Sequence, residues 1–186
     1  YMENLPQSVT VNTAIDAISH AVEGMLSLAA GELSDALARE ALRVLFGEYE
    51  NLRKGSYSPE SRRNLLYGAA VAGMVIANTG TSPVHTLGYS LTYYHGVPHG
   101  RANGLLLPAF LERCLQKDRP RTERVYETLG MGAEEFSDKL AILLGKRERY
   151  ADEELRAWAH KGAQSRKKCA VPFTEEELFA VLKESV

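Results

Sequence analysis

Apolar residues along the chain recur three and four positions apart, which is the spacing of one face of an α-helix. Two segments show this spacing: Ile18, Ala21, Val22 and Met25, and then Leu37, Ala41 and Leu45. No segment alternates apolar and polar residues as a half-buried strand would, and Val, Ile and Thr are not clustered. The pattern therefore predicts an all-α, bundle-like domain of about seven to nine helices over residues 1–186, with no internal repeat.

Helix start and stop signals divide this pattern into elements. Ser58 and Ser82 each place a capping hydroxyl before a proline, and Thr174 opens a capping box. Gly130 is a typical helix stop. The basic segment 164–172 is expected to form an exposed connection. Short loops are expected at 54–58, 95–98, 130–132 and 145–151.

Composition and charge narrow the class of protein. The chain is 45% hydrophobic and 25% charged, which is ordinary for a packed globular protein. Its net charge of -2 gives no electrostatic reason to expect a nucleic acid or an anionic membrane as a partner. Cys114 and Cys169 lie far apart without a CxxC motif, which favours reduced thiols in a cytoplasmic protein, with a single disulfide as the alternative.

Neither the N-terminal segment nor the most apolar run indicates export or membrane insertion. The start "YMENLPQSVT" has no basic region followed by an apolar stretch, so no signal peptide is expected there. The most apolar run extends over about 12 residues up to Asn78, whereas a bilayer requires roughly 20. We expect it to form a buried helix. Because the chain begins at Tyr1, we expect it to be a segment of a longer protein.

Asp16 and His20 form the first candidate for chemistry. They lie four residues apart in "NTAIDAISHAVEG", so a helix would place them on one face, one turn apart. A carboxylate and an imidazole in that arrangement can hold one divalent ion. Glu23, one turn beyond His20, either supports a ligand or faces water.

Three of the five histidines, His85, His95 and His99, follow in one short stretch. In a straight helix His85 and His99 would be about 21 Å apart and unable to share an ion. Gly96 and Pro98 make such a helix unfavourable, because proline disfavours a helical residue before it. The spacing therefore predicts a helix, a reversal and a second helix, which together can bring His85 and His99 to one point.

Three imidazoles and one carboxylate would suit iron(II) or zinc, and an open position would make the site catalytic. A site with one carboxylate and three neutral imidazoles keeps a net positive charge with a divalent ion, and so favours an alkoxide over a neutral alcohol. The alternative is structural: Asp16 as a solvated helix charge, His20 and His85 as packed core residues, and His99 as a loop residue. Motifs of helical metal hydrolases, such as HExxH or a His-Asp dipeptide, are absent.

Two motifs carry a resemblance to a known family. "IDAISHAVEG" contains DxxxHAxE, and in "VHTLGYSLTYYHGVPHGRANGLLLP" a histidine stands fourteen residues before the histidine of PHG. Together they resemble the iron-containing (group III) alcohol dehydrogenases. The resemblance extends from "LPQSVTVNTAIDAISHAVE" to "VPFTEEELFAVLKES", nearly the whole chain. It implies four metal ligands, which fall here on Asp16, His20, His85 and His99.

The resemblance also implies an architecture and a reaction. Family members have a dehydroquinate synthase-like two-domain fold, in which an α/β domain with a Gly-rich loop binds NAD or NADP and a helical domain binds the metal. The chain contains no such loop and corresponds to the helical domain. The implied reaction is metal-assisted hydride transfer between an alcohol or aldehyde and nicotinamide. The alcohol, the metal, the nucleotide preference and a monomeric or homodimeric state are left open, and the alternative is a stand-alone metal-binding or dimerisation remnant.

One position departs from the family pattern. Many members carry a further histidine four residues after the third ligand, where this chain has Tyr89. Tyr89 and His95 are therefore the candidates for a catalytic role in proton transfer, and the residues do not decide between them. Tyr93 and Tyr94 either line a pocket with Tyr89 or pack as core aromatics. His160 is expected on the surface of a helix.

Overall fold

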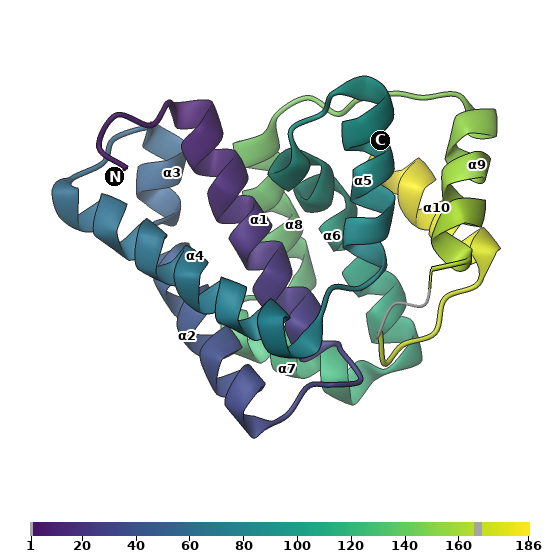
Figure 1. Ribbon diagram of the computed structural model, residues 1–186, viewed down its shortest axis with the longest axis horizontal. Helices are drawn as coiled ribbons and strands as arrows, with labels where there is room; N and C mark the ends of the chain where they lie inside the picture. Colours follow the sequence, from purple (N-terminus) through teal and green to yellow (C-terminus); the bar gives the residue numbers. More distant parts are fainter. Residues whose placement is uncertain (1, 166–168) are drawn as a thin grey trace.

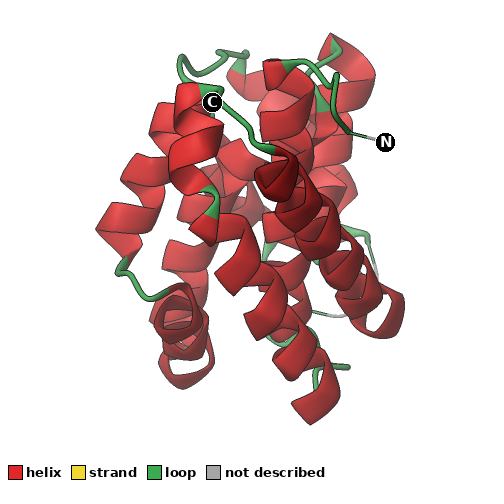
Figure 2. Ribbon diagram, turned by 90° about the vertical axis from the view of Figure 1, so that its left-hand side faces the viewer, coloured by secondary structure: helices red, strands yellow, loops and turns green. Residues whose placement is uncertain are grey.

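The structure of the protein, a computed structural model, describes residues 2–165 and 169–186 (Figures 1 and 2). The helices in these residues are α1 (Gln7–Met25), α2 (Glu32–Gly47), α3 (Tyr49–Lys54), α4 (Pro59–Thr79), α5 (Pro83–His95), α6 (His99–Lys117), α7 (Arg119–Leu129), α8 (Ala133–Leu144), α9 (Asp152–Ala163) and α10 (Glu175–Ser185). The described residues contain no strand, only an isolated bridge between Ser27 and Cys169. The all-α prediction is confirmed.

The described ranges hold ten helices, more than the pattern predicted. Single residues separate two pairs of consecutive helices. Glu48 separates α2 from α3, and Asp118 separates α6 from α7. Asp118 leaves helical geometry because its carboxylate accepts a hydrogen bond from the Arg121 amide and so caps the new helix.

Most of the predicted boundaries are confirmed. Ser58 caps α4 through the Ser61 amide, Thr174 forms its capping box, and Gly130 ends α7 with a φ of 65°. Ser82 is the N-cap residue of α5 and Pro83 begins the helix, as predicted, but the Ser82 hydroxyl donates to Glu23 instead of capping the helix. Within the basic segment 164–172, residues 166–168 lie outside the described part of the chain.

Helix α1 passes through the middle of the molecule, with α2 and α4 on one side of it and α5 and α6 on the other (Figure 1). Its apolar side chains are buried on several faces, as expected of a core helix. Small residues allow close neighbours: a Cβ at Gly24 would lie 2.2 Å from Val75, and one at Gly104 would lie 2.5 Å from Ile15. This central position places both Asp16 and His20 inside the bundle.

The apolar run ending near Asn78 lies in α4, and the helix is only partly buried. One face of α4 packs against α1 and α2, while Leu66, Tyr67 and Met74 are exposed on the other. The expectation of a buried helix therefore holds for one face of α4 and not for the other. In the described part of the chain, no helix combines the length and apolar character needed to cross a membrane.

Candidate metal centre

The predicted reversal brings His85 and His99 together. Helix α5 ends at His95, Gly96 adopts a left-handed φ of 66°, and α6 begins at His99. Only glycine adopts that conformation without steric cost, so the turn depends on Gly96. The ring centroids of His85 and His99 lie 5.2 Å apart.

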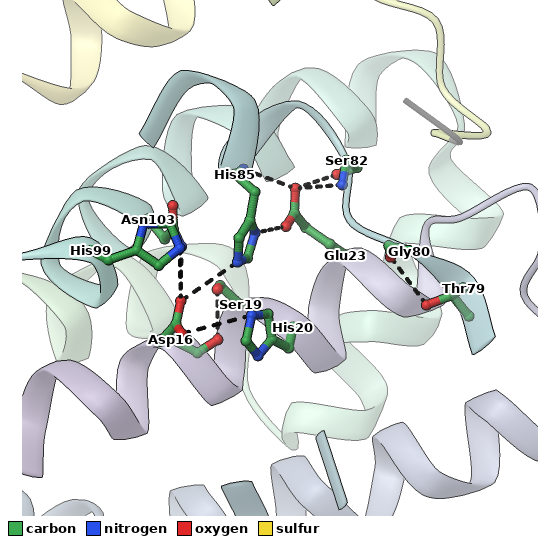
Figure 3. Close-up of polar contacts among 10 residues, drawn as sticks. All are labelled: Asp16, Ser19, His20, Glu23, Thr79, Gly80, Ser82, His85, His99 and Asn103. Carbon is green, nitrogen blue, oxygen red and sulfur yellow. Dashed lines mark hydrogen bonds and ion pairs between the residues drawn. The ribbon is translucent and has the colours of Figure 1, made fainter. Parts of the chain in front are cut away.

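Asp16 of α1 lies at the point where the three imidazoles converge (Figure 3). Its Oδ1 is 3.5 Å from Nε2 of His85 and 3.6 Å from Nε2 of His99. Its Oδ2 is 3.7 Å from Nε2 of His20. The four ligands predicted from the sequence therefore lie together, with the three histidines of α1, α5 and α6 around the carboxylate of Asp16.

The donor atoms fit a divalent cation. Ligand atoms of Asp16, His20 and His85 all lie within 4.8 Å of one another, close enough to share one ion. Nε2 of His85 is buried and has no hydrogen-bond partner. A buried polar nitrogen without a partner is costly, and a metal ion bound to the neutral ring would satisfy it. Three imidazole nitrogens and one carboxylate are a donor set suited to iron(II) or zinc.

Glu23 orients the His85 ring through Nδ1, the ring nitrogen that does not face Asp16. The Glu23 carboxylate is fully buried, contacts Nδ1 of His85, and accepts hydrogen bonds from the Ser82 amide at 3.1 Å and from the Ser82 hydroxyl. This contact keeps the Nδ1 proton in place and turns Nε2 toward Asp16 (Figure 3). Of the two interpretations open for Glu23, the structure shows the one in which it supports a candidate ligand.

Asn103 is a part of the site that sequence reasoning missed. It lies one turn after His99 on α6, and its Nδ2 is 2.8 Å from Oδ1 of Asp16 and 3.1 Å from Nε2 of His99. The signal available in the sequence was an amide one helical turn beyond a candidate ligand, at the start of the apolar run "GLLLP".

The protonation of the candidate ligands follows from their surroundings. Burial alone would lower the pKa of His85, but the carboxylates of Asp16 and Glu23 outweigh it and raise the pKa to about 9. Burial lowers the pKa of His20 and of His99 below the usual range. For Asp16 burial acts in the opposite sense, yet contacts led by His85 hold its pKa below the usual value.

The two candidates for proton transfer occupy different environments. The ring of Tyr89 stacks on His99 at a centroid distance of 5.0 Å, and its side chain remains 53% exposed. His95 lies ten residues after His85, about 15 Å along α5. There its Nε2 is 3.0 Å from Oε1 of Glu154, so His95 lies outside the cluster.

The remaining aromatic and histidine candidates also lie away from the metal centre. Tyr93 and Tyr94 are both exposed, and the ring of Tyr94 stacks on the buried Trp158 of α9 at a centroid distance of 6.2 Å. His160 is exposed and pairs with Glu175, as expected of a surface histidine. Both cysteines are free thiols.

A cavity of about 250 Å³ opens beside Asp16 and His99. Its described lining contains no lysine or arginine, so it offers space for a small uncharged molecule next to the candidate ligands. A larger hollow of about 510 Å³ lies between α3 and α8, but it contains none of the candidate ligands. Both basic side chains in its lining pair with acidic ones, Arg53 with Glu50 and Lys139 with Glu135.

Comparison with known proteins gives a consistent result. The sequence profile described as "Fe-containing alcohol dehydrogenase family, C-terminal" matches residues 10–186. Alcohol dehydrogenase 4 of Schizosaccharomyces pombe is 31% identical over 146 residues, which cover 76% of this chain and 33% of that protein. Long-chain-alcohol dehydrogenase 1 of Geobacillus thermodenitrificans is 32% identical over 68% of this chain and 32% of its own length.

Solved structures show the same similarity in three dimensions. An iron-containing alcohol dehydrogenase from Thermotoga maritima superposes with a TM-score of 0.86 at 33% identity, covering 98% of this chain and 50% of that one. A second iron-containing alcohol dehydrogenase gives a TM-score of 0.86 at 34% identity over the same shares. The chain thus spans about a third of these curated relatives and half of these solved structures.

Proposed function

Because the chain belongs to the Fe-containing alcohol dehydrogenase family and corresponds to its C-terminal part, we propose that residues 1–186 form a helical metal-binding catalytic domain. The proposed reaction is hydride transfer between an alcohol or aldehyde and NAD(P). The observation that carries this proposal is that His20 of α1, His85 of α5 and His99 of α6 converge on Asp16. In addition, Nε2 of His85 is buried and has no hydrogen-bond partner.

In this proposal Asp16, His20, His85 and His99 hold the metal. A bound iron(II) or zinc ion would supply a Lewis acid that polarises the oxygen of the alcohol or aldehyde. Glu23 keeps His85 in the tautomer that presents Nε2 to the centre. The cavity beside Asp16 and His99 accommodates the small-molecule substrate, and apart from these two candidate ligands its lining side chains are uncharged, which suits a neutral alcohol or aldehyde.

Tyr89 takes the proton-transfer position in the proposal. Its ring stacks on His99 and covers one side of the metal centre, while the exposed part of the side chain contacts solvent. A phenol in that place can exchange a proton between the site and water. NAD(P) would be bound by an N-terminal nucleotide-binding domain of the longer protein, which places nicotinamide against the substrate.

The metal content of protein purified without chelator tests the proposal. We expect about one divalent ion per chain, because the four donors surround one point. His99→Ala removes one donor and should lower metal affinity strongly. His160→Ala is the matched control, since His160 is an exposed histidine outside the cluster. Equal metal content in the two variants would contradict the ligand assignment.

A further inference from the structure

The side-chain amide of Asn103 is buried, and only its nitrogen has hydrogen-bond partners. The residue is fully buried; Nδ2 contacts both Asp16 and His99, whereas Oδ1 has no hydrogen-bond partner. The orientation follows from chemistry, because the ionised Asp16 can only accept and therefore selects the N–H end of the amide. In this orientation the N–H groups of the amide have hydrogen-bond acceptors, whereas its carbonyl oxygen has no donor.

The backbone of α5 holds the amide in this orientation. A Cβ at Gly88 would lie 2.1 Å from Oδ1 of Asn103, so only glycine leaves room for the amide at this position. Gly88 is one turn after His85 on the same helix. Asn103 is thus enclosed between α5 on one side and the donor atoms of Asp16 and His99 on the other.

From this geometry we infer that Asn103 is a positioning residue of the metal centre, which fixes the carboxylate of Asp16 and holds the ring of His99 only until an ion binds. The inference rests on the proposed function, in which both contacts are metal ligands. In the metal-free chain the amide donates to Nε2 of His99, which selects the tautomer with a lone pair on that nitrogen. That hydrogen bond gives way when Nε2 coordinates an ion, whereas Oδ1 of Asp16 has a further lone pair and keeps its hydrogen bond from Asn103.

The unpaired Oδ1 supports a role in positioning over one in stability. A buried acceptor without a partner destabilises the folded chain, and an apolar residue of similar shape would avoid that cost. Local conflicts of this kind are expected at functional sites. The N–H contacts to Asp16 and His99 are the gain that offsets it.

Titration of the 186-residue chain with Co²⁺ tests the inference, because the visible absorption of cobalt reports both its affinity and the arrangement of its ligands. Asn103→Leu keeps the approximate shape and removes the N–H donors. We expect cobalt to bind about 10-fold to 100-fold more weakly, the range for loss of a partner that orients a ligand. At saturation its absorption bands should be shifted, while the melting temperature of the metal-free chain stays close to that of the wild type.

Gly88→Ala provides an independent variant that acts on the same amide from behind. The added methyl would displace Oδ1 and so move Nδ2 relative to Asp16. We expect the same weakening and the same spectral shift as in Asn103→Leu. Gly73→Ala is the matched control, because it adds a methyl to helix α4 with nothing within 4 Å, and it should leave cobalt binding unchanged.

A double-mutant cycle separates this route from general disturbance of the fold. If Gly88→Ala acts through the amide, it should lower cobalt affinity in the wild type but not in a chain that also carries Asn103→Ala. Additive losses, or unchanged cobalt affinity and spectrum in the folded Asn103 variants, would overturn the inference while leaving the metal centre intact. A wild-type chain that binds no cobalt would overturn both this inference and the proposed function.

Discussion

At the scale of single residues, two buried carboxylates of this chain differ in what they support. Glu23 contacts His85 and Ser82 at the candidate metal centre. Glu48 is also buried, but it accepts hydrogen bonds from Asn51 of α3 and from Ser61 and Asn64 of α4. The two residues share chemistry and burial, so they allow a function at the metal centre to be separated from a function in stability.

Glu23→Gln should lower metal affinity by about 10-fold to 100-fold, because an amide no longer holds the Nδ1 proton of His85 as a carboxylate does. Competition with a chelator measures this affinity. Glu48→Gln should lower the free energy of unfolding in urea and leave the metal affinity unchanged. Equal metal affinities in the two variants would show that Glu23 does not act through His85.

The raised pKa of His85 predicts proton release when a metal binds. At pH 7.5 the metal-free His85 ring is protonated, since its pKa is about 9, whereas burial keeps His20 and His99 neutral. Coordination requires a free Nε2, so binding should release about one proton per ion. Metal affinity should therefore rise as the pH increases to about 9 and then level off.

Calorimetric titrations in two buffers of different ionisation enthalpy measure that proton count. The count should fall toward zero above pH 9, where His85 is already neutral. A count near zero at pH 7.5 would mean that the two carboxylates do not hold the proton on His85.

At the scale of elements, the approach of α6 to α1 is what makes the site. A Cβ at Gly100 would lie 1.8 Å from the backbone oxygen of Asn12. The start of α6 can therefore contact α1 only because the residue after His99 is glycine. This contact places His99 within reach of Asp16.

Gly100→Ala should force the two helices apart and lower the free energy of unfolding by about 1–3 kcal/mol, the usual range for overpacking. The same change should weaken metal binding, because His99 moves with α6. Gly47→Ala adds a methyl to α2 where nothing lies within 4 Å, and it should not lower stability. Urea unfolding and chelator competition on both variants measure the two effects, and a metal affinity unaffected by Gly100→Ala would contradict this account.

The sequence predicted this arrangement wherever a local signal specified it. The helix–reversal–helix at 95–99 followed from Gly96 and Pro98, and Asp16 and His20 followed from helical spacing. Ser82 was predicted as a cap, but a buried carboxylate 59 residues away takes its hydroxyl. Asn103 was missed for the same reason: its partner Asp16 is 87 residues away, and no local pattern records such a contact.

At the scale of the whole molecule, the chain spans about half of the solved relatives, and its described residues form helices joined by loops, without a strand. All four candidate ligands come from this one unit. No Gly-rich loop between a strand and a helix, the usual cradle for a dinucleotide phosphate, occurs in the sequence. Metal binding and cofactor binding should therefore be separable.

The 186-residue chain alone should bind a divalent ion but oxidise no alcohol and bind NAD(P) poorly. Hydride transfer requires nicotinamide to be held against the substrate, and positioning of this kind lowers the barrier by about 7–11 kcal/mol. Without a second wall, water also reaches the cavity beside Asp16 and His99. Metal analysis, NAD(P) titration and an assay of nicotinamide reduction with a primary alcohol measure the three properties.

Joining this chain to the N-terminal half of the Thermotoga maritima relative should restore nicotinamide reduction, because the other wall of the cleft is then present. Asp16→Ala in that fusion should abolish the activity, since it removes the carboxylate on which the three histidines converge. His160→Ala in the same fusion should retain it. Robust NAD(P)-dependent oxidation by residues 1–186 alone would show instead that the cofactor site lies within these helices.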